Sequence, residues 1–165
     1  MGQLEQNMEY KAHNQYRTML RAYQELERIS TNNGNKISFA DPDYEVRNFF
    51  IHCYHLKDSL KKDSTIALQE DVEKFITESN SLSLAADYAN SFKHSGLDRK
   101  TRSNKVLGNT NKHLRLDLTP IGFIGSARME LTISGEKYDA FTLATECINE
   151  WNNYFARNKV SFKDQ

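Results

Sequence analysis

The residues of this chain that could do chemistry begin with Arg47, Asn48 and His52, which lie within one short stretch. An arginine can hold a phosphate group through two donors, and a histidine can accept the proton of a ribose 2′-hydroxyl. Together they could cleave RNA, with His52 as the base, Arg47 stabilising the phosphorane and Asn48 positioning the phosphate. A plainer interpretation is a solvated arginine and a histidine at the edge of a buried face, because this spacing is common in any chain.

A second candidate is a set of polar residues at helical spacing on two segments. His55 and Asp58 share one face of a helix, while Asp87, Asn90 and His94 follow successive turns of another. If these helices pack side by side, the groups could transfer protons or bind a metal, or form a hydrogen-bond network that fixes helix register. Because no His-Glu-x-x-His or Cys-x-x-Cys spacing is present, we predict neither a metal nor a cofactor. The full candidate cluster is His55, Asp58, Asp87, Asn90, Lys93 and His94.

Charge is distributed unevenly along a chain whose net charge is zero. From Lys93 to Arg115 there are seven basic residues and a single acid, Asp98, so this stretch could attract a phosphate backbone. It could equally contact the chain's own acidic stretch at 41–78 or a second copy. No aromatic residue lies within it, which argues against the stacking platform of a single-strand binder. The candidate nucleic-acid contacts are Arg99, Lys100, Arg102 and Lys105.

Five segments are expected to form amphipathic helices, because apolar residues recur in each at three- to four-residue steps. These helices would position the candidate residues. Asp139 precedes the last segment as a capping residue. The clearest apolar stripe consists of Val46, Phe49, Cys53, Leu56 and Leu60. We predict helices at about 7–30, 43–62, 68–78, 81–94 and 139–157.

Between the fourth and fifth helices the pattern changes from helical to alternating. Leu114, Leu116 and Leu118 alternate with polar residues before a turn signal of proline and glycine, and apolar residues alternate again after it. Such alternation is typical of two half-buried antiparallel strands. We therefore predict a mainly α single domain over residues 1–165, a bundle of about five helices with a small antiparallel β-hairpin at about 105–138 inserted before the last helix.

Composition excludes several classes of protein. The 165 residues include 22 basic and 22 acidic side chains, 38% hydrophobic residues and two prolines, which is typical of a globular domain and not of a disordered chain. The N-terminus lacks the features of a signal peptide, and no stretch is apolar enough for a membrane span. Cys53 and Cys147 lie in apolar helical patterns and are expected to be reduced core residues. We expect a cytoplasmic protein with no membrane partner.

The spacing of Arg47, Asn48 and His52 within a helical bundle resembles the short motif of the HEPN (higher eukaryote and prokaryote nucleotide-binding) superfamily, an arginine and a polar residue followed by a histidine. The strings at 55–58 and 87–94 are similar to those of a group of bacterial proteins with HEPN-like bundles. Many members of the HEPN superfamily are metal-independent ribonucleases of toxin or defence systems, and their active sites often form at a dimer interface. The resemblance therefore implies a homodimer that cleaves or binds RNA, from a bacterial or mobile-element background.

The alternative function is a non-catalytic protein-interaction or dimerisation module. In that case His55, Asp58, Asn90 and His94 tie the second and fourth helices together and act on no substrate. The two hypotheses differ in where these side chains lie. An open cleft favours chemistry, and closure under packed side chains favours a structural role.

Overall fold

The computed structural model describes residues 11–31, 41–93, 101–120 and 122–162. Within these ranges the chain forms five helices and three antiparallel strands. Their order is α2 (Lys11–Thr31), α3 (Pro42–Lys62), α4 (Val72–Glu78), α5 (Asn80–Lys93), β1 (Leu107–Thr119), β2 (Gly122–Ile133), β3 (Glu136–Asp139) and α6 (Ala140–Asn158). The predicted mainly α bundle with an antiparallel insertion before the last helix is confirmed.

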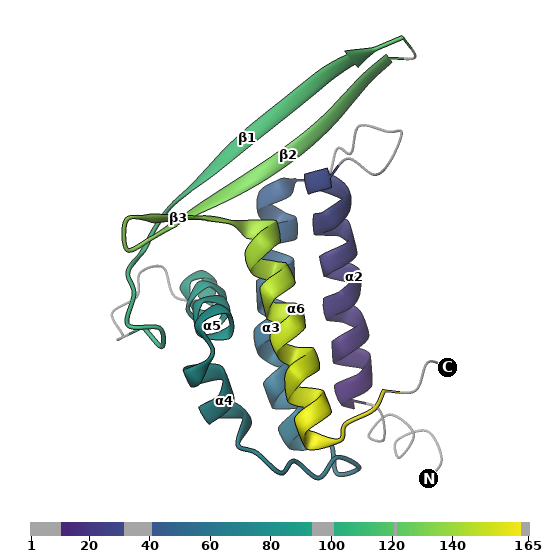
Figure 1. Ribbon diagram of the computed structural model, residues 1–165, viewed down its shortest axis with the longest axis vertical. Helices are drawn as coiled ribbons and strands as arrows, with labels where there is room; N and C mark the ends of the chain where they lie inside the picture. The colour runs from purple at the N-terminus through teal and green to yellow at the C-terminus, as the bar shows by residue number, and fades with distance from the viewer. Residues whose placement is uncertain (1–10, 32–40, 94–100, 121, 163–165) are drawn as a thin grey trace.

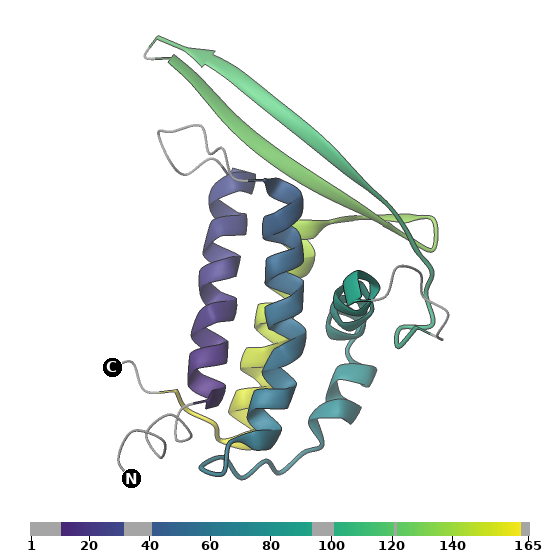
Figure 2. The same ribbon diagram turned by 180° about the vertical axis from the view of Figure 1, so that it is seen from behind.

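Three long helices, α2, α3 and α6, run side by side and form the main body of the molecule (Figure 1). The shorter helices α4 and α5 lie along the other side of α3, so α3 has helical neighbours on several sides. The strands cross one end of the bundle, near the end of α2 and the start of α3, as the view from behind also shows (Figure 2). None of the described helices combines the length and apolar character that crossing a bilayer requires.

The core lies between α3 and its neighbours, on the apolar faces that the sequence pattern predicts. Phe49 and Cys53 of α3 are fully buried, as are Trp151 and Tyr154 of α6. The indole Nε1 of Trp151 donates to Cys53 Sγ at 3.3 Å, which joins the two helices at their centre. Cys53 and Cys147 are both buried, as expected, and form no disulfide bond. Burial of these large side chains is the main source of the bundle's stability.

Helix ends follow capping residues, and one predicted boundary is wrong for that reason. Asp71 accepts hydrogen bonds from the backbone N–H groups of Glu73 and Lys74, so α4 begins at Val72 and not at residue 68. The predicted cap of the last helix, Asp139, accepts from the N–H of Thr142 at 2.9 Å and is confirmed. Of the predicted helical positions, 7–10 and 94 lie outside the described residues.

The strands form one long hairpin, β1 with β2, to which β3 adds a short third strand that the prediction missed. Strand register runs from Thr110 opposite Leu131 to Thr119 opposite Gly122. Ser134 and Gly135 have φ values of 51° and 82°, the left-handed conformations that a two-residue hairpin turn requires. β3 has only four residues, which is too few for a recognisable alternation.

Candidate functional site

The structure places Arg47 and His52 on different flanks of α3. Their separation of five residues corresponds to about 140° around a helix axis. His52 faces α2, where Nε2 of Gln15 lies 3.1 Å from its Nδ1 and donates to its carbonyl oxygen at 3.0 Å. Arg47 is exposed near Tyr88 of α5, and Asn48 is half-buried. The backbone positions of the arginine and the histidine therefore lie on different flanks of α3.

The contacts of His52 favour its neutral form. The side chain is half-buried, and burial lowers the pKa of the imidazole below its usual value. The Gln15 amide group that faces Nδ1 carries only donors, so a ring that accepts at Nδ1 fits this arrangement and a protonated ring does not. His52 thus joins α3 to α2.

The helices that carry the two predicted polar ladders do pack together. Phe50 of α3 and Tyr88 of α5 make an edge-to-face contact with ring centroids 5.2 Å apart. The carboxylates, however, turn to different partners: Asp58 accepts from Lys57 at 2.8 Å, whereas Asp87 contacts the segment that precedes β1. The expected adjacency of the helices is confirmed, but these contacts do not bring Asp58 and Asp87 into a shared centre.

The other residues of the predicted sets are not seen to meet in a shared site within the described part of the chain. His55 and Asn90 are half-buried on α3 and α5. The side chain of Lys93 and the whole of His94, Arg99 and Lys100 lie outside the described part of the chain.

Asp87 fastens the segment that leads from α5 into β1. Its side chain is buried, and it accepts hydrogen bonds from the backbone N–H groups of Arg102 and Ser103 and from the Ser103 hydroxyl. Three donors therefore satisfy the buried carboxylate. The role of Asp87 that these contacts indicate is to attach the segment before β1 to α5.

The largest polar cluster among the described residues was not predicted. Glu73 of α4 accepts from Lys57 at 2.9 Å, from Lys61 at 3.1 Å and from Arg102 at 2.9 Å. Burial alone would raise the pKa of Glu73, but the hydrogen bonds from these three cations lower it to about 2. Lys57 also donates to Asp58. The cluster joins α3, α4 and the segment before β1 through charge-assisted hydrogen bonds.

One signal for this cluster was present in the sequence. Lys57 lies within the apolar stripe, four residues after Cys53 and three before Leu60. A lysine in a buried stripe requires an anionic partner. The identity of that partner could not be predicted, because Glu73 reaches Lys57 only when α4 folds back beside α3.

Both described members of the predicted nucleic-acid set are engaged within the chain. Arg102 pairs with Glu73 and donates to the Tyr54 hydroxyl at 3.3 Å. Lys105 donates to the Tyr138 hydroxyl at 2.8 Å. The alternative that the basic stretch contacts the chain's own acidic residues is thus observed for Arg102.

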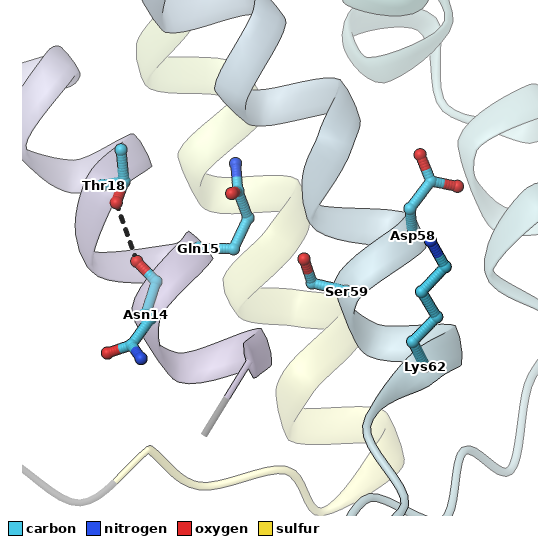
Figure 3. Close-up of a pocket in the computed structure, with 6 residues that line it drawn as sticks. All are labelled: Asn14, Gln15, Thr18, Asp58, Ser59 and Lys62. Carbon is cyan, nitrogen blue, oxygen red and sulfur yellow. Dashed lines mark hydrogen bonds between the residues drawn. The ribbon is translucent and has the colours of Figure 1, made fainter. Parts of the chain in front are cut away.

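A shallow groove of about 360 Å³ lies between α2 and α3. Figure 3 shows Gln15 and Ser59 in the space between these helices, while Asp58 and Lys62 project from α3 away from α2. Thr18 donates to the carbonyl oxygen of its own helix at Asn14 and so offers no free donor. The groove is lined by Asn14, Gln15, Thr18, Asp58, Ser59 and Lys62. Among these side chains, no hydroxyl is hydrogen-bonded to a base that could activate it as a nucleophile.

The hairpin extends well past the bundle. Met129 and Leu131 of β2 are 3% and 1% exposed, where this strand contacts α2, α3 and α6. Leu114, further out on β1, is 69% exposed. Figures 1 and 2 both show the two strands continuing beyond the ends of the helices. We call residues 113–120 and 122–126 the hairpin arm.

The two faces of the hairpin arm differ in character. Leu114 lies opposite Ala127 in the register, and because directly opposed residues share a face, it lies on the side that meets the bundle further down. Arg115 and Asp117 occupy the opposite face, where Nε of the arginine lies 2.9 Å from the carboxylate.

The base of the hairpin arm is attached to the start of α3. Lys112 Nζ lies 3.3 Å from the carboxylate of Asp43 and 3.6 Å from that of Asp41. Thr110, two residues earlier, meets the hydroxyl of Tyr88 at 3.3 Å. These contacts and the buried part of β2 hold the hairpin in a defined direction.

β1 has a long open edge. The sheet order is β1-β2-β3, and β1 has 13 residues. One side of β1 pairs with β2, and the other side has no partner strand in the described chain. Such an edge presents backbone N–H and C=O groups that can pair with a further strand.

Comparisons with protein families, with curated proteins and with solved structures find no match. Within the described ranges, no buried side-chain nitrogen or oxygen lacks a hydrogen-bond partner, and no group of His, Cys, Asp and Glu residues is arranged to hold a metal. The buried polar side chains of the described bundle are thus satisfied internally, whereas the hairpin arm offers an open strand edge.

Proposed function

We propose that this chain is a non-catalytic interaction module, in which the helical bundle is a rigid support and the hairpin arm binds another polypeptide strand. The observation that carries the proposal is the unpaired edge of the 13-residue β1, which extends beyond the bundle with Leu114 69% exposed. A strand added to such an edge gains backbone hydrogen bonds, and the alternating side chains select the partner. Exposed edges of this length are otherwise avoided in proteins.

The polar residues of the bundle support the same assignment. His52 is held by Gln15, Asp87 by the segment before β1, and Glu73 by three cations. Each contact joins two elements of the fold, which is the role that the interaction-module hypothesis gives to such residues.

The ribonuclease prediction requires Arg47 and His52 to act on one phosphate. Their positions on different flanks of α3 do not favour this within one chain. Incubation of the purified chain with single-stranded RNA in EDTA tests the prediction directly. We expect no cleavage. Cleavage that disappears in His52→Ala would replace the present proposal with a catalytic one.

A shortened hairpin tests whether the arm serves binding or the fold. Deleting residues 115–118 and 123–126 removes four opposed pairs and leaves the face alternation unchanged. The contacts of Lys112 and Met129 at the base are retained. At a concentration at which the intact chain is monomeric, we expect the deletion to cost less than about 1 kcal/mol. The melting temperature should then stay within about 2 °C of the intact chain, because a chain of this size loses roughly 2–4 °C per kcal/mol.

The matched control is Met129→Ala at the base of the same hairpin. Met129 is 3% exposed, so this truncation should cost about 2–5 kcal/mol and lower the melting temperature by roughly 4 °C or more. If the shortened hairpin is destabilised as much as this control, the arm is part of the fold and the proposed function fails.

A further inference from the structure

We propose that the partner of the hairpin arm is a second copy of this chain, joined by antiparallel pairing of β1 with β1 around Leu116. The inference rests on the proposed function, since it names the partner of the same surface. It follows from the order of side chains along the outer part of β1, combined with its open edge.

The stretch 113–119, which reads His-Leu-Arg-Leu-Asp-Leu-Thr, is complementary to itself when reversed about Leu116. In an antiparallel pair centred there, Arg115 of each copy lies directly opposite Asp117 of the other. On the second face, position 114 of each copy lies opposite position 118 of the other. Directly opposed ion pairs stabilise antiparallel strands.

Neighbouring registers lack this complementarity. Centring the pair on Arg115 sets two arginines against each other, and centring it on Asp117 sets two carboxylates together. Like charges directly opposite are destabilising. A centre at Leu114 or Leu118 leaves neither charge opposite its complement. Charge therefore selects the register around Leu116.

The arrangement also suits the shape of the molecule. A two-fold axis perpendicular to the sheet keeps equivalent faces of the two copies on the same side. Residues 113–119 span about 23 Å at the rise of a β-strand. They start just beyond Lys112, which is anchored to Asp43. The outer end of each β1 strand then lies beside the base of the other hairpin arm.

In the single chain the charges are available for this exchange. The Arg115 and Asp117 side chains pair with each other while remaining 77% and 51% exposed. An exposed pair of this kind contributes little to the stability of one chain. Substituting either residue should therefore leave the fold intact and change only the association.

Sedimentation velocity of the full chain over a concentration series measures the association. We expect a monomer–dimer equilibrium. Arg115→Asp and Asp117→Arg each place like charges opposite at two symmetric positions, and each should raise the dimer Kd at least tenfold, about 1.4 kcal/mol. Arg17→Asp, which changes an exposed arginine of α2, is the matched charge control and should leave Kd unchanged.

Mixing the two arm variants gives the decisive readout. The aspartate introduced at position 115 of one variant faces the arginine introduced at 117 of the other, so a heterodimer of near wild-type affinity should form. The double variant Arg115→Asp/Asp117→Arg should likewise regain its homodimer. A merely misfolded hairpin arm would show neither rescue.

Two results would overturn the inference. One is a wild-type chain that stays monomeric up to its solubility limit, and the other is a dimer that neither reversal weakens or that mixing fails to restore. Either result leaves the proposed function standing if the shortened hairpin keeps its melting temperature. In that case the partner of the hairpin arm is a strand of another protein. Failure of the shortened hairpin to fold would instead refute the proposed function itself.

Discussion

Replacing Glu73 by glutamine should destabilise the bundle far more than loss of a surface charge usually does. The carboxylate accepts hydrogen bonds from Lys57, Lys61 and Arg102 at 2.9–3.1 Å. Without it, the Lys57 ammonium group, whose side chain is only 9% exposed, retains Asp58 as its remaining ion-pair partner. The change therefore weakens the attachment of α4 and of the segment before β1 to α3.

The magnitude follows from the pKa of Glu73. Burial raises this pKa, but the hydrogen bonds from the cations prevail and lower it from 4.5 to about 2. A difference of this size corresponds to about 3 kcal/mol at 1.36 kcal/mol per pKa unit. The side chain is 33% exposed, so solvent screening reduces the expected loss to about 1.5–2.5 kcal/mol. This lowers the melting temperature by roughly 3–10 °C.

The lowered pKa of Glu73 also determines how its contribution to stability changes with pH. Because the folded pKa of Glu73 is lower than the unfolded one, the unfolded chain takes up the proton first as pH falls. The stabilisation is complete above the unfolded value of 4.5 and is lost between 4.5 and about 2. The difference between wild type and Glu73→Gln should shrink over this window.

Urea unfolding at pH 7 and at successively lower pH measures both quantities. Glu78→Gln is the matched control on the same helix, since Glu78 makes only an exposed contact of 3.8 Å with Lys74, and it should cost no more than about 0.5 kcal/mol. Equal effects of the two substitutions would contradict the reasoning. So would a difference that does not change with pH.

Two further predictions concern the contacts of His52 and Asp87. Burial lowers the pKa of His52, so the wild type should lose stability as pH falls below the unfolded value of 6.5. In urea unfolding, His52→Gln should abolish this part of the pH dependence. An identical pH profile in the variant would show that His52 is not its source. Asp87→Asn removes the charge that holds Arg102 and Ser103 and should cost about 1–3 kcal/mol. Amide hydrogen exchange should accelerate at residues 101–105, and unchanged exchange there would contradict the proposed attachment.

Much of the local structure could be predicted from short stretches of the chain. The stripe from Val46 to Leu60 forms the buried face of α3, and Asp139 caps α6 as its position suggested. The alternating leucines predicted β1, whose outer part proves to extend beyond the bundle. Helical and strand periods, like caps, depend on neighbours a few residues apart, so they can be read without the fold.

The candidate site was harder to predict from the sequence, because the partners of its side chains come from distant segments. Arg47 and His52 looked like a pair along the chain, yet the turn of the helix separates them around its axis. Gln15 meets His52 across 37 residues, and no local pattern connects the two. The polar-ladder hypothesis required α3 and α5 to pack together, as they do, but the sequence does not show which of their faces meet.

By itself, the amino-acid sequence determined which segments are helical, which alternate as strands, and where charges lie along each of them. Only the tertiary structure decided that Glu73 neutralises Lys57 and that β1 continues past the end of the helices. The physical reason is that secondary structure depends on short-range geometry, whereas the partner of a charge and the exposure of a strand depend on how whole elements pack. The open edge of β1 is a property of that packing.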